Sequence, residues 1–178
     1  MHLHDTDIDM HRNADESTRW LDQSEIRTQQ ALGPLVLVAA YVVDDWRLVA
    51  AHGGFLLLTA LHDALGPYAH LYRWVLKPLR VVKPDLRADN PEPHRFAAIF
   101  GGSVLSVAAY LLEKGHATAG WMLAWTVAIL GGIAFFGWCA GCFMYYVINR
   151  FGAGGFFGRA PVDGTAFPGV RPPRSGGR

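Results

Sequence analysis

The chain alternates polar and apolar blocks, and this pattern predicts helices that cross a membrane. Apolar residues are concentrated in residues 31–66 and 96–148. About 20 apolar helical residues cross a bilayer core of roughly 30 Å, because a helix satisfies its own backbone hydrogen bonds. We therefore predict an all-α fold, an integral membrane four-helix bundle. The predicted spans are residues 26–43, 48–65, 96–112 and 121–148.

The first and last spans differ most in length. The apolar part of the first span covers only residues 31–43, so it crosses the bilayer only if residues 26–30 form its first turns. Arg27 would then reach the headgroups with its long side chain. The last span, residues 121–148, is long enough to tilt, kink or project beyond the membrane.

Loop lengths predict that the four helices form two hairpins. Tight connections at residues 44–47 and 113–120 join the helices within each pair, and a polar cytoplasmic loop at residues 73–95 joins the pairs. The transmembrane domain would occupy residues 26–150. The polar tail of residues 1–25 and the Gly/Pro/Arg-rich tail of residues 151–178 are predicted to be disordered.

The charge pattern predicts the orientation of the bundle. Of the 16 Lys and Arg residues, only Arg47 and Lys114 lie in the two tight connections, and the other 14 lie on the opposite side. This bias places both termini in the cytoplasm by the positive-inside rule. The same basic residues are spread over loops rather than gathered on a helical face, so we expect no nucleic-acid partner. Membrane lipids are the expected surroundings.

The two predicted hairpins resemble each other, which indicates a parallel internal repeat. Arg27 begins an apolar run that reaches Tyr41 before an acidic turn, and Arg95 begins a similar run that reaches Tyr110. Gly pairs in the later helices, at residues 101–102 and 131–132, permit close helix packing. They favour a compact bundle or contact with a partner, including a homo-oligomer.

The sharpest chemical feature is Cys139-Ala140-Gly141-Cys142. On a regular helix the two Cβ atoms would lie about 5–6 Å apart on one face, whereas a disulfide needs nearly 3.8 Å. Gly141 is where the helix can distort. The pair is also expected near a helix C-terminus, where the dipole and the low dielectric both favour the neutral thiol and weaken a thioredoxin-type interpretation. In the repeat, Gly66 and Ala69 stand where the second hairpin has Cys139 and Cys142.

Three interpretations of the cysteine pair remain open at this stage. Cys139 and Cys142 act in redox chemistry or sulfur transfer, or they are small packing residues beside glycines. As a weaker alternative, His62 and His70 would complete a tetrahedral metal site with the two sulfurs, but the sequence does not show that they meet. We therefore assign no metal and no cofactor.

Two segments of the chain resemble a known family. They are Asp89-Asn90-Pro91-Glu92-Pro93-His94-Arg95-Phe96-Ala97 and Gly137-Trp138-Cys139-Ala140-Gly141-Cys142 with the following residues to Tyr145. The chain is similar, from about residue 26 to 150, to the bacterial membrane proteins called domain of unknown function 4395. The resemblance implies a four-helix protein of the bacterial plasma (inner) membrane with a Cys-x-Gly-Cys motif. It further implies proximity to thioredoxin-like or sulfur-transfer proteins.

The leading hypothesis is an accessory membrane protein whose Cys139/Cys142 pair exchanges electrons or sulfur at the cytoplasmic face. Its partner would be thioredoxin-like or a sulfurtransferase, and any enzymatic activity would be thiol–disulfide exchange or sulfur transfer. The alternative is a structural or assembly subunit of a larger membrane complex. Transport of a small sulfur species is disfavoured, because no span carries a central charged residue.

Overall fold

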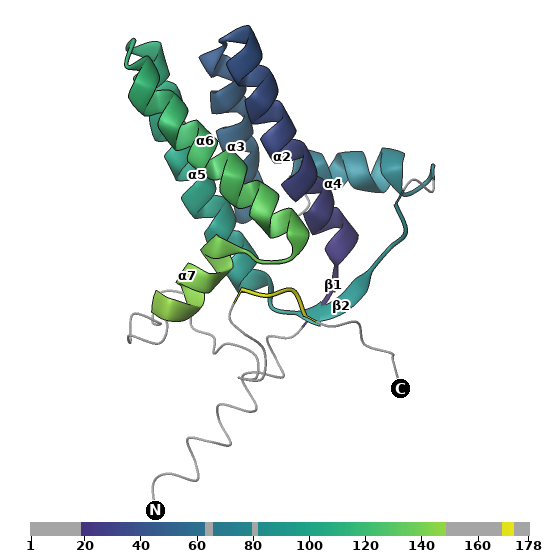
Figure 1. Ribbon diagram of the computed structural model, residues 1–178. Helices are drawn as coiled ribbons and strands as arrows, with labels where there is room; N and C mark the ends of the chain where they lie inside the picture. Colours follow the sequence, from purple (N-terminus) through teal and green to yellow (C-terminus); the bar gives the residue numbers. More distant parts are fainter. Residues whose placement is uncertain (1–18, 63–65, 80–81, 149–168, 173–178) are drawn as a thin grey trace, which may run out of the picture.

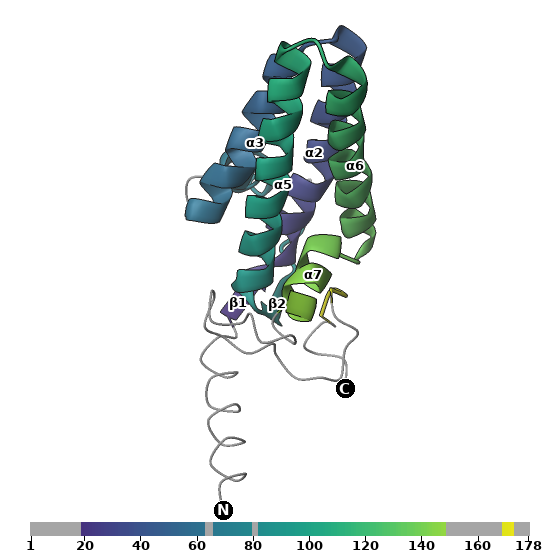
Figure 2. The same ribbon diagram turned by 90° about the vertical axis from the view of Figure 1, so that its left-hand side faces the viewer.

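The computed structural model describes residues 19–62, 66–79, 82–148 and 169–172. Four long helices lie side by side, β1, β2 and α7 gather at one end of the bundle, and α4 projects from its side (Figures 1 and 2). The elements are β1 (Arg19–Asp22), α2 (Gln23–Val43), α3 (Trp46–Leu61), α4 (Pro67–Leu71), the π-helical η2 (Tyr72–Leu76), β2 (Leu86–Asp89), α5 (Pro91–Glu113), α6 (Ala117–Phe136) and α7 (Ala140–Ile148). The predicted all-α class and its two hairpins, α2–α3 and α5–α6, are confirmed.

Within the described residues, three helices are long and apolar enough to cross a membrane: α2, α5 and α6. Residues 26–30 are helical, as the first predicted span requires, because α2 has 21 residues and begins at Gln23. The second helix, α3, is shorter than expected, with 16 residues. It ends at Leu61 because His62 adopts an extended conformation, with φ −156°. The expected order of length between the first two helices is thus reversed.

The last predicted span is not one helix, which corrects the expectation for residues 121–148. Helix α6 ends at Phe136 because Gly137 takes the left-handed conformation, with φ +116°. The chain then turns, and α7 begins at Ala140 as a separate helix beside the start of α5 (Figure 2). The distortion expected at Gly141 therefore occurs before the cysteine pair, at Gly137.

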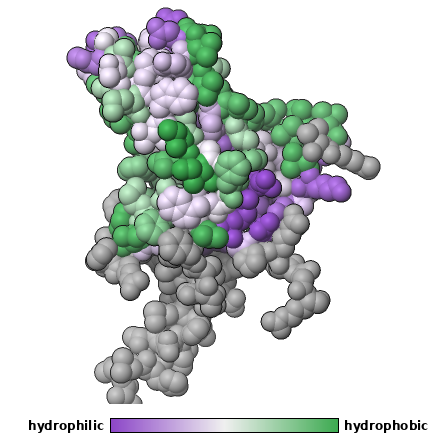
Figure 3. Space-filling view, in the orientation of Figure 1, coloured by the Kyte–Doolittle hydropathy of each residue, from purple (hydrophilic) through white to green (hydrophobic). Residues whose placement is uncertain are grey.

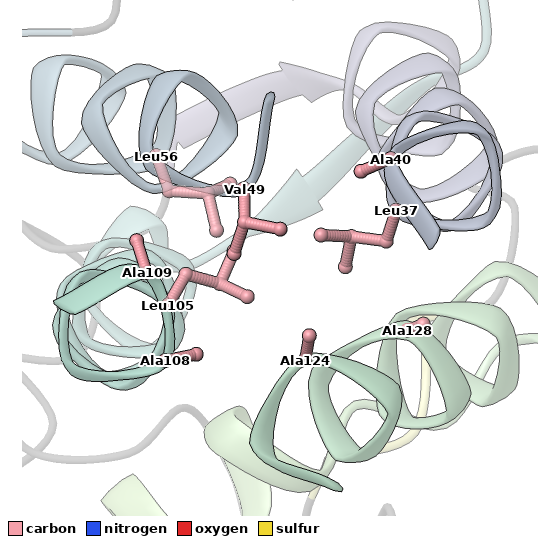
Figure 4. Close-up of a cluster of buried hydrophobic side chains, with 9 residues drawn as sticks. All are labelled: Leu37, Ala40, Val49, Leu56, Leu105, Ala108, Ala109, Ala124 and Ala128. Atoms are coloured by element: carbon pink, nitrogen blue, oxygen red, sulfur yellow. The ribbon is translucent and has the colours of Figure 1, made fainter. Parts of the chain in front are cut away.

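Small side chains fill the centre of the bundle and larger apolar side chains lie outside. Figure 4 shows nine buried residues from the four long helices, five of which are alanines. Helix α6 buries Ala124 and Ala128 but exposes Met122, Ile129 and Phe136. Hydrophobic residues cover much of the outer surface in Figure 3. Close backbone contact inside and large apolar groups outside are typical of helices packed in lipid.

A close helix crossing joins α3 and α5 at Gly53 and Gly102. A Cβ atom on Gly102 would lie 2.8 Å from Leu57 Cγ and 3.0 Å from the carbonyl oxygen of Gly53. The other predicted glycine pair is looser. A Cβ on Gly131 would make ordinary contact with Pro34, 3.4 Å away, and one on Gly132 would meet nothing within 4 Å.

A short antiparallel pair, β1 with β2, closes the base of the bundle. Arg19 faces Asp89 and Asp22 faces Leu86 in this pair. Residues 19–25 were expected in the disordered N-terminal tail and residues 86–89 in a polar loop, so both expectations are corrected here. Each strand leads into the first helix of a hairpin, and the order strand, long helix, helix, short helix occurs twice. This order supports the internal repeat. Residues 1–18 lie outside the described part of the chain.

A second correction concerns the start of the predicted loop 73–95, which is helical. Helices α4 and η2 form an arm that projects sideways from the bundle (Figure 1). Leu71, Trp74 and Val75 are exposed on it, and Figure 3 shows hydrophobic residues along the upper side of this arm. Arg73 pairs with Glu25 of α2 at 3.0 Å and holds the arm to the bundle.

The carboxylate of Asp22 joins the start of α2, the π-helical η2 and the segment before β2, and we expect its removal to destabilise the fold. Asp22 accepts hydrogen bonds from Ser24 N at 3.1 Å, Tyr72 Oη at 2.7 Å and Asp85 N at 3.0 Å. We expect Asp22→Ala to lower the free energy of unfolding by about 2–3 kcal/mol, because a helix cap is lost and the buried Tyr72 hydroxyl loses its partner. Thermal unfolding in detergent micelles measures the change.

The matched control is Asp45→Ala. Asp45 caps α3 through Arg47 N at 2.9 Å, an exposed interaction of the same kind. Its loss should cost about 1 kcal/mol. Equal effects of the two substitutions would contradict the role assigned to Asp22 at the base.

Candidate functional site

The two cysteines form a disulfide at the start of α7. Their Cα atoms are 5.2 Å apart. Cys139 directly precedes the helix: its carbonyl oxygen accepts from Phe143 N at 2.9 Å, and its Sγ accepts from Cys142 N at 3.2 Å. Cys139 thus caps α7, and its sulfur lies at the N-terminal end of this helix, where the backbone N–H groups have no partner within the helix.

This position corrects the electrostatic argument made from the sequence. The pair was expected near the C-terminal end of a continuous helix, where negative charge is disfavoured. Because Gly137 ends α6, the pair lies instead at the N-terminal end of α7. The partial positive charge there stabilises a thiolate, as in redox-active Cys-x-x-Cys pairs. The part of the objection to a thioredoxin-type pair that rested on the helix dipole is therefore wrong.

The two sulfurs differ in access. Cys142 is buried, with 3% of its surface exposed, whereas Cys139 is half-buried and borders a cavity between the helices. Cys139 is therefore the more exposed cysteine of the pair.

The buried sulfur contacts a histidine that is itself bound to a carboxylate. Cys142 Sγ lies 3.6 Å from Nδ1 of His94, and Nε2 of His94 lies 2.9 Å from Oδ2 of Asp89. The amide of Gln23 donates to the same oxygen at 2.7 Å. Burial acts to raise the pKa of Asp89, but His94, Gln23 and the Asn90 N–H together hold this pKa below its ordinary value. Asp89 is therefore ionised at neutral pH, and it orients the imidazole toward the sulfur.

Sequence reasoning did not select His94 or Asp89 as site residues. His94 lies in the first turn of α5, 48 positions before Cys142, and no local pattern shows that contact. The available signal was that both residues belong to the segment Asp89–Ala97, which carries the family resemblance together with the cysteine motif.

The internal repeat shows that these groups occur in one half of the fold. Cys139, Cys142 and the buried Tyr145 correspond to Gly66, Ala69 and the buried Tyr72, which begin and follow α4 in the same way. If the repeat is aligned on Arg27 and Arg95, Ile26 stands where the second half has His94. The first half thus has the same local frame with unreactive side chains.

A short segment near the end of the chain covers the disulfide loop. We call residues 169–172 the C-terminal strap. The carbonyl oxygen of Gly169 accepts a hydrogen bond from Cys139 N at 2.8 Å, and Arg171 N donates a hydrogen bond to the carbonyl oxygen of Gly137 at 2.9 Å. The Arg171 guanidinium donates to the carbonyl oxygen of Phe135 at 3.2 Å. These four residues correct the expectation of a wholly disordered tail. Residues 149–168 and 173–178 lie outside the described ranges.

The structure does not assemble the weak metal candidate. Among the described residues, no group of three or more His, Cys, Asp or Glu side chains is placed to hold a metal ion. His62 and His70 therefore do not join the two sulfurs. His70 instead contacts the Gly66 carbonyl oxygen through Nδ1 at 3.0 Å.

The fold and site define a class of protein: an apolar four-helix bundle with a Cys-x-Gly-Cys disulfide at the strand end, which is the end of the bundle where β1 and β2 pair. The family model described as domain of unknown function (DUF4395) matches residues 21–150, and the chain belongs to this family. No curated protein and no solved structure matches the chain.

Proposed function

We propose that this chain is an integral membrane protein that carries out thiol–disulfide exchange at Cys139 and Cys142. The observation that carries the proposal is the Cys142–His94–Asp89 arrangement beside a half-buried Cys139. Packing alone does not require an imidazole and a carboxylate in line with a cysteine sulfur. Exchange requires such groups, because a thiolate leaves and must be stabilised or protonated.

The proposed reaction proceeds in two displacements. A thiolate of the partner attacks Cys139 Sγ, the internal S–S bond breaks, and Cys142 leaves as a thiolate that takes a proton from His94. The second thiolate of the partner then attacks the partner sulfur in the mixed disulfide and releases the thiolate of Cys139. The partner dithiol is oxidised to a disulfide, and the Cys139/Cys142 pair is reduced to a dithiol.

The partner of this exchange would be a thioredoxin-like protein on the cytoplasmic side. The site lies at the strand end of the bundle, opposite the tight turns with Arg47 and Lys114 (Figure 1). The excess of Lys and Arg at the strand end supports a cytoplasmic location in the plasma membrane by the positive-inside rule. The disulfide itself favours electron exchange over transfer of sulfur from a sulfurtransferase.

Thiol labelling in sealed vesicles tests this proposal. Vesicles of known orientation are reduced, and a membrane-impermeant maleimide is added from either side before or after mild oxidation. We expect labelling from the cytoplasmic side that disappears on oxidation. In the Cys142→Ser variant, labelling of Cys139 should persist after oxidation, because its partner is missing. Cysteines that react only after unfolding in detergent would refute the exchange proposal.

One contact favours a structural role as the second candidate. A Cβ atom on Gly141 would lie 2.6 Å from Ala97 Cβ, so the motif also seats α7 on α5. A purely structural subunit would tolerate Cys139→Ala with Cys142→Ala and fail with Gly141→Leu. The exchange protein would lose thiol exchange in the double cysteine variant.

A further inference from the structure

A cavity of about 550 Å³ lies between the long helices and reaches the disulfide loop. Its walls come from α2, α3, α5 and α6, and Cys139, Ala140 and Gly141 line one end. Leu37 and Leu56, which point between the helices in Figure 4, belong to its apolar lining. The volume falls within the range of small-molecule sites, about 300–1,000 Å³.

Most polar groups of this cavity lie toward the end of the bundle that carries the disulfide. Gln29 and Gln30 lie in the second turn of α2, and Arg95 lies in the second turn of α5. Both turns belong to the end of the bundle that carries the disulfide (Figure 2). The part farther along the helices is lined mainly by apolar side chains such as Val104, Val127 and Leu130, with His52 and Thr126 as its polar members. This distribution suits a ligand with a polar ring and an apolar tail.

We infer that the cavity binds a lipid-soluble quinone, which accepts electrons from the reduced Cys139/Cys142 pair. The inference rests on the proposed exchange function, and the quinone is the oxidant that converts the reduced Cys139/Cys142 pair back to the disulfide. A dithiol that becomes a disulfide releases two electrons and two protons, and a quinone takes up the same number to become a hydroquinone. The quinone ring would lie beside Cys139, and its isoprenoid tail would extend between the helices.

The reaction balances with groups in the structure. The bond between Cys139 Sγ and Cys142 Sγ forms while two electrons pass to the ring. The two thiol protons are transferred to the two ring oxygens, and the proton of Cys142 leaves through His94, 3.6 Å away. Gln30 and Arg95 supply N–H donors near the ring, where negative charge develops on the oxygens. The disulfide is then ready to accept electrons from the next partner dithiol.

Two adjacent glycines of α6 provide a matched test of the cavity. Gly131 lines it, whereas Gly132 does not and meets nothing within 4 Å of an added Cβ. The full chain is reduced in lipid nanodiscs, freed of reductant and mixed anaerobically with a short-chain ubiquinone. Quinone absorbance and a gel shift of the thiols are followed together. We expect one quinone to be reduced per cysteine pair, with Gly131→Leu slower by about tenfold and Gly132→Leu unchanged.

Each result decides the inference separately from the exchange function. Equal rates for Gly131→Leu and Gly132→Leu would overturn the quinone inference, because the quinone would then not occupy the cavity that Gly131 lines. Another occupant, such as a lipid tail, would fill the cavity instead. Reaction of the wild-type pair with quinone no faster than that of free dithiothreitol would also overturn it. Reduction of the disulfide by a small dithiol is measured in parallel. If that exchange proceeds and the quinone reaction does not, only the quinone site is refuted, and if both fail, the exchange proposal itself is refuted.

Discussion

Replacing His94 with alanine is expected to slow reduction of the Cys139–Cys142 disulfide by about a hundredfold. Nδ1 of His94 lies 3.6 Å from Cys142 Sγ, so the imidazole can give a proton to the sulfur as it leaves. Without the imidazole, the thiolate would leave into a buried site with 3% exposure. Anaerobic reduction by dithiothreitol, quenched with a maleimide and resolved by gel shift, measures the rate.

Two controls separate proton transfer from a structural role of His94. His116→Ala changes an exposed histidine at the far end of the bundle and should leave the rate unchanged. Free imidazole added to the His94→Ala variant should restore part of the lost rate, which a packing defect would not allow. Asp89→Asn should give a smaller loss of about tenfold, because His94 stays in place without its ionised partner. Reduction of the His94→Ala variant at the wild-type rate would refute the assigned role.

The second large effect concerns stability and the crossing of α3 over α5. Gly53→Leu is expected to lower the free energy of unfolding by about 3 kcal/mol or to prevent folding, because overpacking forces the helices apart. A Cβ atom on Gly53 would already lie 3.1 Å from Leu105 Cβ and 3.2 Å from the carbonyl oxygen of Gly102. Thermal unfolding in detergent and size-exclusion chromatography measure the loss.

The adjacent residue is the control for this crossing. A Cβ atom on Gly54 would meet nothing within 4 Å, so Gly54→Leu should change the free energy of unfolding by no more than about 0.5 kcal/mol. The two variants have the same composition and differ only in which side of α3 carries the leucine. Similar melting temperatures for both would show that the α3–α5 crossing does not limit stability.

The sequence predicted the long helices well because their signal is local. Apolar runs and polar turns suffice to find α5 and α6, and Arg27 with the following glutamines extends α2 as expected. The end of α6 was missed because Gly137 lies within an apolar run, where glycine is common in transmembrane helices and does not predict a break. The strands β1 and β2 are four residues each and pair across more than 60 positions, so no local period indicates them.

The same distinction applies to the candidate site. Cys139 and Cys142 were selected from their spacing, which is visible in the chain. Their place at a helix N-terminus depends on the single turn at Gly137, and their contact with His94 depends on how α7 packs against α5. The local sequence pattern does not indicate long-range packing of this kind. The argument from the pattern therefore placed the cysteines at the negative C-terminal end of a helix, whereas they lie at the positive N-terminal end of α7.

The C-terminal strap has a consequence for the order in which the protein is made. The cysteines and α7 are synthesised before residues 169–172, whose backbone forms hydrogen bonds with Cys139 and Gly137. During that interval Cys139 N and Gly137 O lack these hydrogen-bond partners. The disulfide loop is thus among the last parts of the described structure to be covered during synthesis, and its cysteines can pair before Gly169 and Arg171 are in place.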